Sequence, residues 1–438
     1  MLAGSIYDNM SVKMPSGVVR AFDAKTGKLV WNFDPGNPDS TAPLAQGQHY
    51  SLSSPNSWST SAADDKLGMI YIPFGMGAVD QYGAKRPPTT EKFASSIVAL
   101  DSGTGQLKWV FQTVHHDLWD MDVPAQPALV DLPIGGQMVP ALVQSTKTGN
   151  IFVLDRRTGK PVIPVEERKV PGNAAPGDWV APTQPFSHAS FMPLDPVRER
   201  DMWGATMLDQ LTCRIAFRKM RYDGPFTPPS LQGTLVYPGN FGVMDWGGMA
   251  IDPVRGIAFA NPSYMAFVDK LTPNKPKWPE HATNRGLNPN AGAPFAVYLN
   301  PFLSKLGLPC QAPPWGYVAG MDLATGKVMW KHKNGTIVDQ SPVPLPFKLG
   351  VHSLGGPMTT AGGVAFMSST LDDFVRAYDV TTGRQLWEDR LPAGGQATPM
   401  SYQGRDGRQY VVVVAGGHGT LGTKAGDDVI AYALPRAA

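Results

Sequence analysis

AFDAKTGKLVW (21–31) is the first of five copies of one pattern, and this pattern decides the fold. Each copy contains an aspartate, a Thr-Gly pair and then a tryptophan eight residues after the aspartate, except that Ile163 replaces the tryptophan in the third copy. The recurrence of one short unit along a chain indicates a repeat architecture. The other copies are ALDSGTGQLKW (99–109), VLDRRTGKPVI (153–163), GMDLATGKVMW (320–330) and AYDVTTGRQLW (377–387).

The pattern is typical of a β-hairpin. The aspartate ends one strand and its carboxylate can accept hydrogen bonds from the turn amides, while the glycine supplies the positive φ that the turn needs. The tryptophan then falls at a fixed place on the next strand, where it can pack between neighbouring sheets. We therefore interpret the repeated aspartates and tryptophans as structural, and we look for function elsewhere.

The spacing of the copies predicts the number of sheets. The interval between Asp155 and Asp322 is more than twice as long as any other, and we expect it to hold two degenerate units around 233–262. The chain then has roughly six sheets of three or four strands, arranged radially. The prediction is a single all-β domain over 1–438, a β-propeller with antiparallel blades and docked tryptophans.

Composition narrows the classes of partner. The 438 residues carry 38 Lys and Arg against 36 Asp and Glu, a net charge of +2, which argues against nucleic acid as the main partner. No apolar run reaches the roughly 18–20 residues of a membrane helix, and no signal peptide is visible.

The two cysteines, Cys213 and Cys310, have no zinc-site spacing, and the sequence leaves open whether they form a disulfide or remain free thiols.

Polar and aromatic segments interrupt the repeat, and VHHDLWDMD (114–122) is the densest of them. In a propeller, the connections between blades gather around one face, so such segments can converge there. Neighbouring strand residues point to opposite faces, which makes a zinc ion shared by His115 and His116 improbable. The chain has no dinucleotide fingerprint, no phosphate-binding loop and no nucleophile elbow, so nicotinamide, nucleotide and serine-hydrolase chemistry find no support.

The repeats, together with a set of short motifs, resemble the pyrroloquinoline-quinone (PQQ) dependent dehydrogenases, and within them the membrane-bound glucose, quinate and shikimate branch. The resemblance extends from about Asp8 to the end of the chain. It implies a quinoprotein-type propeller with four-stranded blades. The full ring would have eight blades, and this chain would supply about six of them. The motifs are PNSW (55–58), HHDLWDMD (115–122), STKTGNIFVLDRRTG (145–159), WGG (246–248), ANP (260–262) and AGGHG (415–419).

The resemblance assigns roles to residues of this chain. Asp120 matches the family's catalytic base, and Lys147 matches the lysine that binds the ortho-quinone oxygens. Trp58 matches the tryptophan stacked on the cofactor plane, while Trp246 is expected near the same face. The remaining assignments are Asn261 near the cofactor, His418 at the cofactor and substrate site, and Asp8 with Asn9 as metal ligands.

These residue types suit the chemistry that the resemblance implies. PQQ is a flat, electrophilic ortho-quinone with three carboxylates, so an indole face suits its plane and a cation suits its charge. Lys147 and a bound Ca²⁺ or Mg²⁺ would polarise the reactive carbonyl, and Asp120 would accept the alcohol proton. We expect Asp117 and Asp122 to hold the loop and His115 and His116 to be structural. Asp80 is a weaker candidate for facing the substrate.

The resemblance also implies partners and location. The substrate would be a sugar or cyclitol, with glucose expected ahead of quinate or shikimate, and electrons would pass to ubiquinone at the periplasmic side of the inner membrane. The family's N-terminal membrane domain and first blades lie outside this sequence, so we expect membrane association only through a segment absent from this chain. The alternative is a non-catalytic propeller scaffold, for which the repeat alone would suffice.

Overall fold

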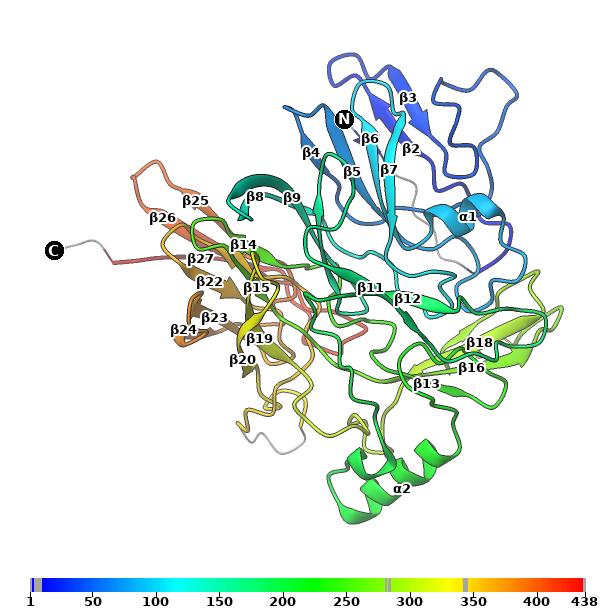
Figure 1. The fold of residues 1–438 in the computed structure, drawn as a ribbon. Helices are drawn as coiled ribbons and strands as arrows, with labels where there is room; N and C mark the ends of the chain where they lie inside the picture. The colour runs from blue at the N-terminus through cyan, green and yellow to red at the C-terminus, as the bar shows by residue number, and fades with distance from the viewer. Residues whose placement is uncertain (1, 4–9, 280–281, 283–284, 342–345, 436–438) are drawn as a thin grey trace.

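The computed structural model describes residues 2–3, 10–279, 282, 285–341 and 346–435. Within these ranges the chain is almost entirely β, and six antiparallel sheets follow one another around the molecule in chain order (Figure 1). The third hairpin of the repeat pattern is closed by a bridge between Leu154 and Pro161, and the others by paired strands. The number of sheets in this series agrees with the roughly six expected from the repeat, and the described residues form two further sheets outside it.

The six sheets are made of the following strands. The first sheet contains β1 (Leu2–Ala3), β2 (Val19–Phe22) and β3 (Leu29–Phe33), and the second contains β4 (Ala62–Asp64), β5 (Met69–Phe74), β6 (Ser96–Asp101) and β7 (Leu107–Gln112). The third contains β8 (Ala128–Ile134), β9 (Gln137–Ser145) and β10 (Ile151–Asp155), and the fourth contains β14 (Ala250–Asp252), β15 (Ile257–Ala260), β19 (Tyr317–Asp322) and β20 (Val328–Lys333). The fifth contains β21 (Met358–Thr359), β22 (Val364–Met367), β23 (Phe374–Asp379) and β24 (Gln385–Arg390), and the sixth contains β25 (Met400–Gln403), β26 (Gln409–Ala415) and β27 (Asp428–Ala433).

The aspartate of each repeat caps its own turn, as expected. In the first copy, Asp23 Oδ1 accepts hydrogen bonds from the backbone N–H groups of Lys25 at 3.0 Å and Thr26 at 2.7 Å. The Thr26 hydroxyl donates to the same oxygen at 2.8 Å. Gly27 follows with φ of 69°, which lets the chain reverse into β3.

The tryptophans of three repeats, Trp31, Trp109 and Trp330, dock on the turn of the next sheet. The indole N–H of Trp31 donates to the Ser102 carbonyl at 3.0 Å, and that of Trp109 donates to the Arg156 carbonyl at 3.1 Å. A Cβ atom on Gly105 would lie 2.5 Å from the Trp31 ring, so glycine is required for this close approach. The repeat therefore specifies the contact between sheets as well as the hairpin within each sheet.

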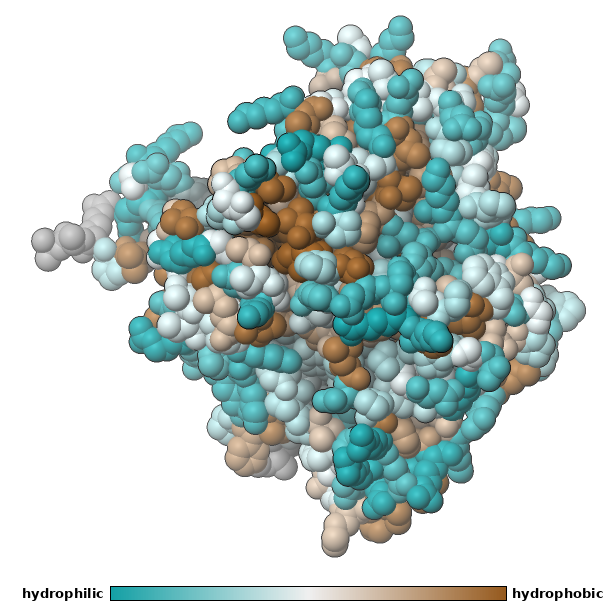
Figure 2. All heavy atoms as spheres, in the orientation of Figure 1, coloured by the Kyte–Doolittle hydropathy of each residue, from teal (hydrophilic) through white to brown (hydrophobic). Residues whose placement is uncertain are grey.

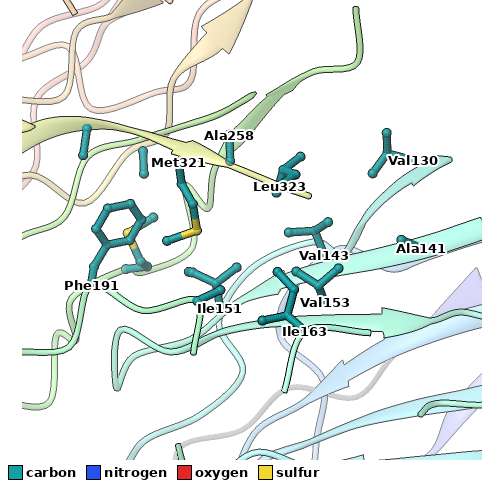
Figure 3. Packing of buried hydrophobic residues seen from close by; sticks show 14 of the residues in the cluster. Val130, Ala141, Val143, Ile151, Val153, Ile163, Phe191, Ala258, Met321 and Leu323 are labelled. Carbon is teal, nitrogen blue, oxygen red and sulfur yellow. The ribbon is translucent and has the colours of Figure 1, made fainter. Parts of the chain in front are cut away.

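The third and fourth sheets pack directly on each other despite the long interval between them in the sequence. Ile163 takes the place of the docking tryptophan, and its side chain lies against Gly326 of the next repeat turn. Val143 and Val153 from one sheet face Met321 and Leu323 from the other in a shared apolar core (Figure 3). The long interval is thus an insertion between two adjacent blades.

The prediction of two degenerate blade units around 233–262 is wrong. β13 (Thr234–Val236) joins β16 (Phe267–Pro273), β18 (Phe295–Pro301) and β17 (Leu287–Asn288) in a separate sheet, whereas β14 and β15 are the first two strands of the blade that β19 and β20 complete. The segment was misassigned because a short apolar strand has the same pattern in a blade and in an inserted sheet.

The inserted residues also form a hairpin and a protruding helix. β11 (Val165–Lys169) pairs with β12 (Thr183–Ser187), and α2 (Met207–Arg218) lies at the lower end of the molecule in Figure 1. A disulfide between Cys213 of α2 and Cys310 ties the helix to the body of the protein, which settles the alternative that the sequence left open. The remaining helices are α1 (Pro88–Phe93) and a short 3-10 turn, Glu199–Asp201.

Candidate active site

Lys147 lies at the centre of a buried cluster of charges. It occupies the tight turn between β9 and β10 and is 5% exposed. Its ammonium group donates to the Asp120 carbonyl oxygen at 2.9 Å, to Asp120 Oδ1 at 3.2 Å and to Asp122 Oδ2 at 3.0 Å. The structure therefore brings Asp120 and Lys147, which the resemblance pairs, into direct contact.

The loop after β7 is shaped so that Asp120 reaches Lys147. Asp117 is fully buried, and its carboxylate accepts hydrogen bonds from the backbone N–H groups of Trp119 and Met121, each at 2.8 Å, and from the Ser95 hydroxyl at 2.6 Å. Asp120 has φ of 58°, in the left-handed region that residues with a Cβ rarely adopt. Such strain is held in place by the surrounding contacts and is common at functional sites.

The pKa values of the two carboxylates beside Lys147 are shifted in opposite directions. Burial raises the pKa of Asp120, and the negative charges of Asp122 and Asp80 add to the rise, so this pKa stands well above its ordinary value although Lys147 opposes the shift. Burial also acts on Asp122, but Lys147 and hydrogen bonds, one of them from the Met76 N–H at 2.7 Å, outweigh it and lower its pKa. Asp120 is thus the carboxyl suited to exchange a proton.

The side chains of Asp120, Asp122 and Lys147 also differ in their exposure to solvent. The Asp120 side chain is 24% exposed, whereas those of Asp122 and Lys147 are 9% and 7% exposed. A ligand entering the site therefore meets Asp120 first, and Asp122 remains a fixed partner of the lysine. The carboxylates raise the pKa of Lys147 above its ordinary value in spite of burial, so the lysine stays charged.

Trp58 supplies a flat apolar surface next to this charge. The Lys147 Nζ lies 5.8 Å from the centroid of the Trp58 ring, within the range of a cation–π contact. Trp58 is half-buried, and Asn56 and Ser57 before it are buried. Within the described part of the chain, the Ser57 hydroxyl has no hydrogen-bond partner. An indole face, a cation and a free hydroxyl fit a flat, electron-poor, anionic group such as PQQ.

The segment that contains Trp246 wraps around Lys147. The Val243 N–H donates to the Lys147 carbonyl at 2.7 Å, and burial raises the pKa of Asp245 to about 6 although Lys147 lowers it. The Trp246 side chain is 37% exposed. Sequence reasoning chose Trp246 in this segment and missed Asp245, although both lie in the same polar interruption of the repeat.

Asn261 lies on the other side of the same segment. Its side-chain amide donates to Ser353 Oγ at 3.0 Å and to the Gly355 carbonyl at 2.8 Å. Leu354, next to Gly355, contacts the Trp246 segment, because the Gly247 N–H donates to the Leu354 carbonyl at 3.3 Å. Asn261 is therefore connected to the cluster through neighbouring backbone and not by direct contact with Lys147.

The hydrogen bonds of His418 are local. Its backbone N–H donates to Thr423 Oγ1 at 2.8 Å, and its ring Nδ1 accepts from the Leu421 N–H at 3.4 Å. Among the residues that the structure describes, no hydrogen bond or ion pair joins His418 to Asp120 or Lys147. Its role at the cofactor stays a prediction.

The predicted metal ligands, Asp8 and Asn9, lie outside the described residues. Within the described ranges, no group of three or more His, Cys, Asp or Glu side chains is arranged to hold a metal ion.

The two histidines of the loop have different hydrogen-bond partners. His115 contacts Gln112 Oε1 at 2.7 Å, whereas His116 lies between Glu91 Oε2 at 3.0 Å and Asp178 Oδ1 at 3.1 Å. The segment is an irregular loop in which His116 has φ of 41°, and not the regular strand on which the sequence argument against a shared zinc ion relied. Burial lowers the pKa of His116, but its two carboxylate partners outweigh burial and raise it.

Comparison with known proteins identifies the family of the chain. The family described as PQQ glucose/ethanol/alcohol dehydrogenase, beta-propeller domain, matches residues 1–411. The chain is 52% identical to a quinoprotein glucose dehydrogenase of Escherichia coli over 99% of its length and 43% identical to a quinate/shikimate dehydrogenase (quinone) of Acinetobacter baylyi over 100%. It spans 56% of the length of each of these relatives.

Solved structures show the same fold. The quinohemoprotein alcohol dehydrogenase of Comamonas testosteroni superposes with a TM-score of 0.63 at 22% identity, covering 99% of this chain and 58% of that protein. At that identity the likeness concerns the fold alone, and the family match supplies the assignment. The chain belongs to the PQQ-dependent quinoprotein dehydrogenase family and contains its β-propeller domain.

Proposed function

We propose that this chain carries the cofactor-binding propeller of a PQQ-dependent dehydrogenase that oxidises a hydroxyl group of a sugar, with glucose as the first substrate to test. One observation carries the proposal: Asp120 and Trp58 both lie against the buried ammonium group of Lys147. A base, a flat aromatic surface and a fixed positive charge are the three features that quinone-dependent alcohol oxidation asks of a protein.

The residues around Lys147 would have different roles in the reaction. Trp58 would support the ring plane of the cofactor, and Lys147 would stabilise negative charge on the quinone oxygens. Asp120 is partly exposed and in its ionised form would accept the proton of the substrate hydroxyl, while Asp122 holds the lysine and Asp117 holds the loop. When bound, PQQ supplies the acceptor for the hydride that leaves the carbinol carbon. A divalent cation, Ca²⁺ or Mg²⁺, would favour the ionised form of Asp120 if it bound beside that carboxylate, and Asp8 and Asn9 stay its predicted ligands.

We propose glucose ahead of the cyclitols because of the sequence identity of this chain to its relatives. The relatives named quinoprotein glucose dehydrogenase are 51% to 52% identical to this chain, whereas the quinate/shikimate relative is 43% identical. Quinate or shikimate is the alternative substrate. The non-catalytic scaffold is disfavoured, because burying Lys147 with two carboxylates is costly and a scaffold gains nothing from it.

The compartment and the electron acceptor belong to the same proposal. We place the protein in the periplasm, with ubiquinone as acceptor and membrane anchoring through a segment outside this sequence. The disulfide between Cys213 and Cys310 supports this placement, since disulfides persist in oxidising compartments. The name of the Acinetobacter relative includes a quinone as acceptor, which supports the same class of electron transfer.

The test is dye-linked oxidation by the purified chain after addition of PQQ with Ca²⁺ or with Mg²⁺. We expect reduction of the dye with glucose, and a lower rate with quinate at equal concentration. Faster turnover of quinate would favour the alternative substrate. Cofactor uptake without oxidation of either substrate would contradict the catalytic proposal for this chain.

A further inference from the structure

His116 joins three separate segments of the chain through its imidazole ring. Its Nδ1 atom lies 3.0 Å from Glu91 Oε2 in α1, and its Nε2 atom lies 3.1 Å from Asp178 Oδ1 in the connection between β11 and β12. The ring is buried, and the indole of Trp179 stacks on it with the ring centroids 3.6 Å apart. The proposed function gives this arrangement no role, although His116 lies shortly before Asp120 in the same loop.

The two carboxylate contacts fit an imidazole that is protonated on both nitrogens. A neutral ring has one N–H group and one lone pair, and the lone pair would face a carboxylate oxygen and repel it. The stacked indole face of Trp179 also favours a cation. The charged groups that face the ring are Glu91, Asp178 and Arg86. Burial and Arg86 lower the pKa of His116, but the hydrogen bonds to the two carboxylates outweigh them and raise it.

The connection between β11 and β12 is fastened to the rest of the site at the same place. Asp178 Oδ2 accepts a hydrogen bond from the Gly83 N–H at 2.8 Å, and the Tyr82 hydroxyl donates to the Pro176 carbonyl at 3.3 Å. A Cβ atom on Gly83 would lie 2.4 Å from His116 Cε1, so this segment passes close against the ring. In Figure 1 the hairpin lies between α1 and the inserted sheet, and in Figure 2 mostly hydrophilic side chains cover this region. The imidazole is thus enclosed beneath a solvated hairpin.

The turn that follows His116 leads directly to Asp120. These two residues have φ of 41° and 58°, so the turn begins and ends in the left-handed region. Between them, the Asp117 carboxylate accepts hydrogen bonds from the Trp119 and Met121 N–H groups, each at 2.8 Å. Strained conformations of this kind persist only while the surrounding contacts hold them. Loss of the contacts at His116 would therefore relax the turn and displace Asp120.

From these contacts we propose that His116 is a positioning residue for the reaction, because its two carboxylate partners hold the turn that aims Asp120 at the substrate hydroxyl. The inference rests on the proposed function, in which Asp120 is the base. It carries a dependence on pH, since only the doubly protonated ring holds both carboxylates. The support is complete below about pH 6.5 and is lost as the pH rises through the raised pKa of folded His116.

The first experiment compares PQQ-dependent dye reduction by the wild type, His116→Gln and His115→Gln over a range of pH. His115 is the matched control, because it lies in the same loop and its ring contacts Gln112 and Glu167 instead. We expect kcat of His116→Gln to fall about 10²-fold with KM for glucose nearly unchanged, since a misplaced base lowers the rate more than the affinity. The wild type and the control should lose kcat at alkaline pH, and His116→Gln should lack this alkaline limb.

The variant Glu91→Gln changes the charge beside His116 and keeps a hydrogen-bond acceptor. Within the described chain Glu91 Oε1 is buried without a partner, so the amide oxygen can take the place of Oε2 while the amide nitrogen takes the unpartnered position. With one negative charge removed, the pKa of His116 should fall, and the alkaline limb should move to lower pH by about one unit or more. A histidine that only fills space would leave the limb where it is in the wild type.

Amide hydrogen exchange gives a second readout that needs no cofactor. The amides of residues 116–122 should lose protection at alkaline pH in the wild type and at every pH in His116→Gln, while the repeat hairpins stay protected and verify that the fold is intact. Unchanged protection of 116–122 in His116→Gln, or an unchanged kcat and pH profile, would overturn the proposal. If the wild type shows the loss of protection but oxidises no sugar, the proposed function fails and His116 keeps only the role of holding the turn.

Discussion

Lys147 is the residue on which the site depends. Its ammonium group is buried with two carboxylates, and their environments shift the pKa of Asp120 upward and that of Asp122 downward. Pairs of titratable groups whose pKa values are pushed apart are typical of the acid and base of a site. Asp120 also has the strained backbone and the greater exposure of the two, which makes it the candidate for the base.

Replacing Asp120 by Asn should lower the rate of substrate oxidation while leaving PQQ binding intact. The amide keeps the shape of the side chain but cannot accept the substrate proton, so we expect turnover to fall by about 10²–10⁴. PQQ uptake should persist because Trp58 and Lys147 are unchanged. The measurement is dye-linked turnover together with a PQQ titration. Asp101→Asn, in an exposed repeat turn, is the control, and turnover by Asp120→Asn at the control's rate would be incompatible with a base at this position.

Asp269 should make stability depend on pH. Burial raises its pKa to about 7, although Asn240 opposes the rise. The folded state then holds the proton more tightly than the unfolded state, whose pKa is about 3.9, so this contribution to stability is complete below about pH 4 and is lost as the pH rises through about 7.

The loss amounts to about 4 kcal/mol of unfolding free energy. Asp269→Asn should therefore lose less stability than the wild type between pH 5 and pH 8, as measured by denaturant unfolding. The same dependence on pH in both proteins would show that Asp269 is ionised in the folded state at low cost.

At this scale the sequence named residues that the structure brings together, and their roles stay predictions. Asp120, Lys147 and Trp58 come together as the resemblance implied, because their motifs are short and specific. Asp245 was missed, since a carboxylate in a loop carries no signal of burial until the fold brings it to Lys147. For His418 the sequence motif was recognised, but the contacts of this residue in the structure are local.

At the scale of the element, the repeat works as a chain of contacts from one sheet to the next. A tryptophan, or Ile163 in one case, lies on the glycine of the following turn. Gly105 and Gly27 occupy the same position in two repeats and have φ of 71° and 69°, but only Gly105 is covered by an indole ring, and nothing in the described chain lies within 4 Å of a Cβ on Gly27.

This pair allows a matched test of docking. Gly27→Ala should cost about 1 kcal/mol, the price of a Cβ at positive φ. Gly105→Ala adds a Cβ 2.5 Å from the Trp31 ring, and the forced shift should cost about 1–3 kcal/mol more. Thermal unfolding of both variants measures the difference. Equal midpoints would mean that the tryptophan contact contributes nothing to stability.

Most of the fold was predictable because the repeat specifies both the hairpin and its neighbour. The turn residues at fixed offsets predicted the strands around Asp23, Asp101, Asp322 and Asp379. The insertion between Asp155 and Asp322 was not predictable in this way, since its strands pair across long separations, such as β13 with β16, and have no repeated turn to set their register.

At the scale of the whole molecule, the disulfide closes a long loop. Cys213 and Cys310 are separated by 97 residues, and removing a cross-link over a loop of this length should cost about 2–5 kcal/mol of stability. We expect the double variant Cys213→Ser/Cys310→Ser to unfold at a lower temperature than the wild type. A reducing agent should lower the wild-type midpoint and leave that of the variant unchanged, because the chain has only two cysteines.

The central claim is that the propeller binds PQQ between Trp58 and the Lys147 cluster. The most direct measurement is a titration of the purified chain with PQQ in the presence of Ca²⁺ or Mg²⁺, followed by quenching of tryptophan fluorescence. We predict one PQQ per chain, and binding about tenfold weaker in Trp58→Ala because the stacking surface is lost. Trp387→Ala, at a residue that is 38% exposed in a repeat strand, is the control and should bind as the wild type does. Absence of PQQ uptake by the wild type, or equal affinity in Trp58→Ala, would contradict the account.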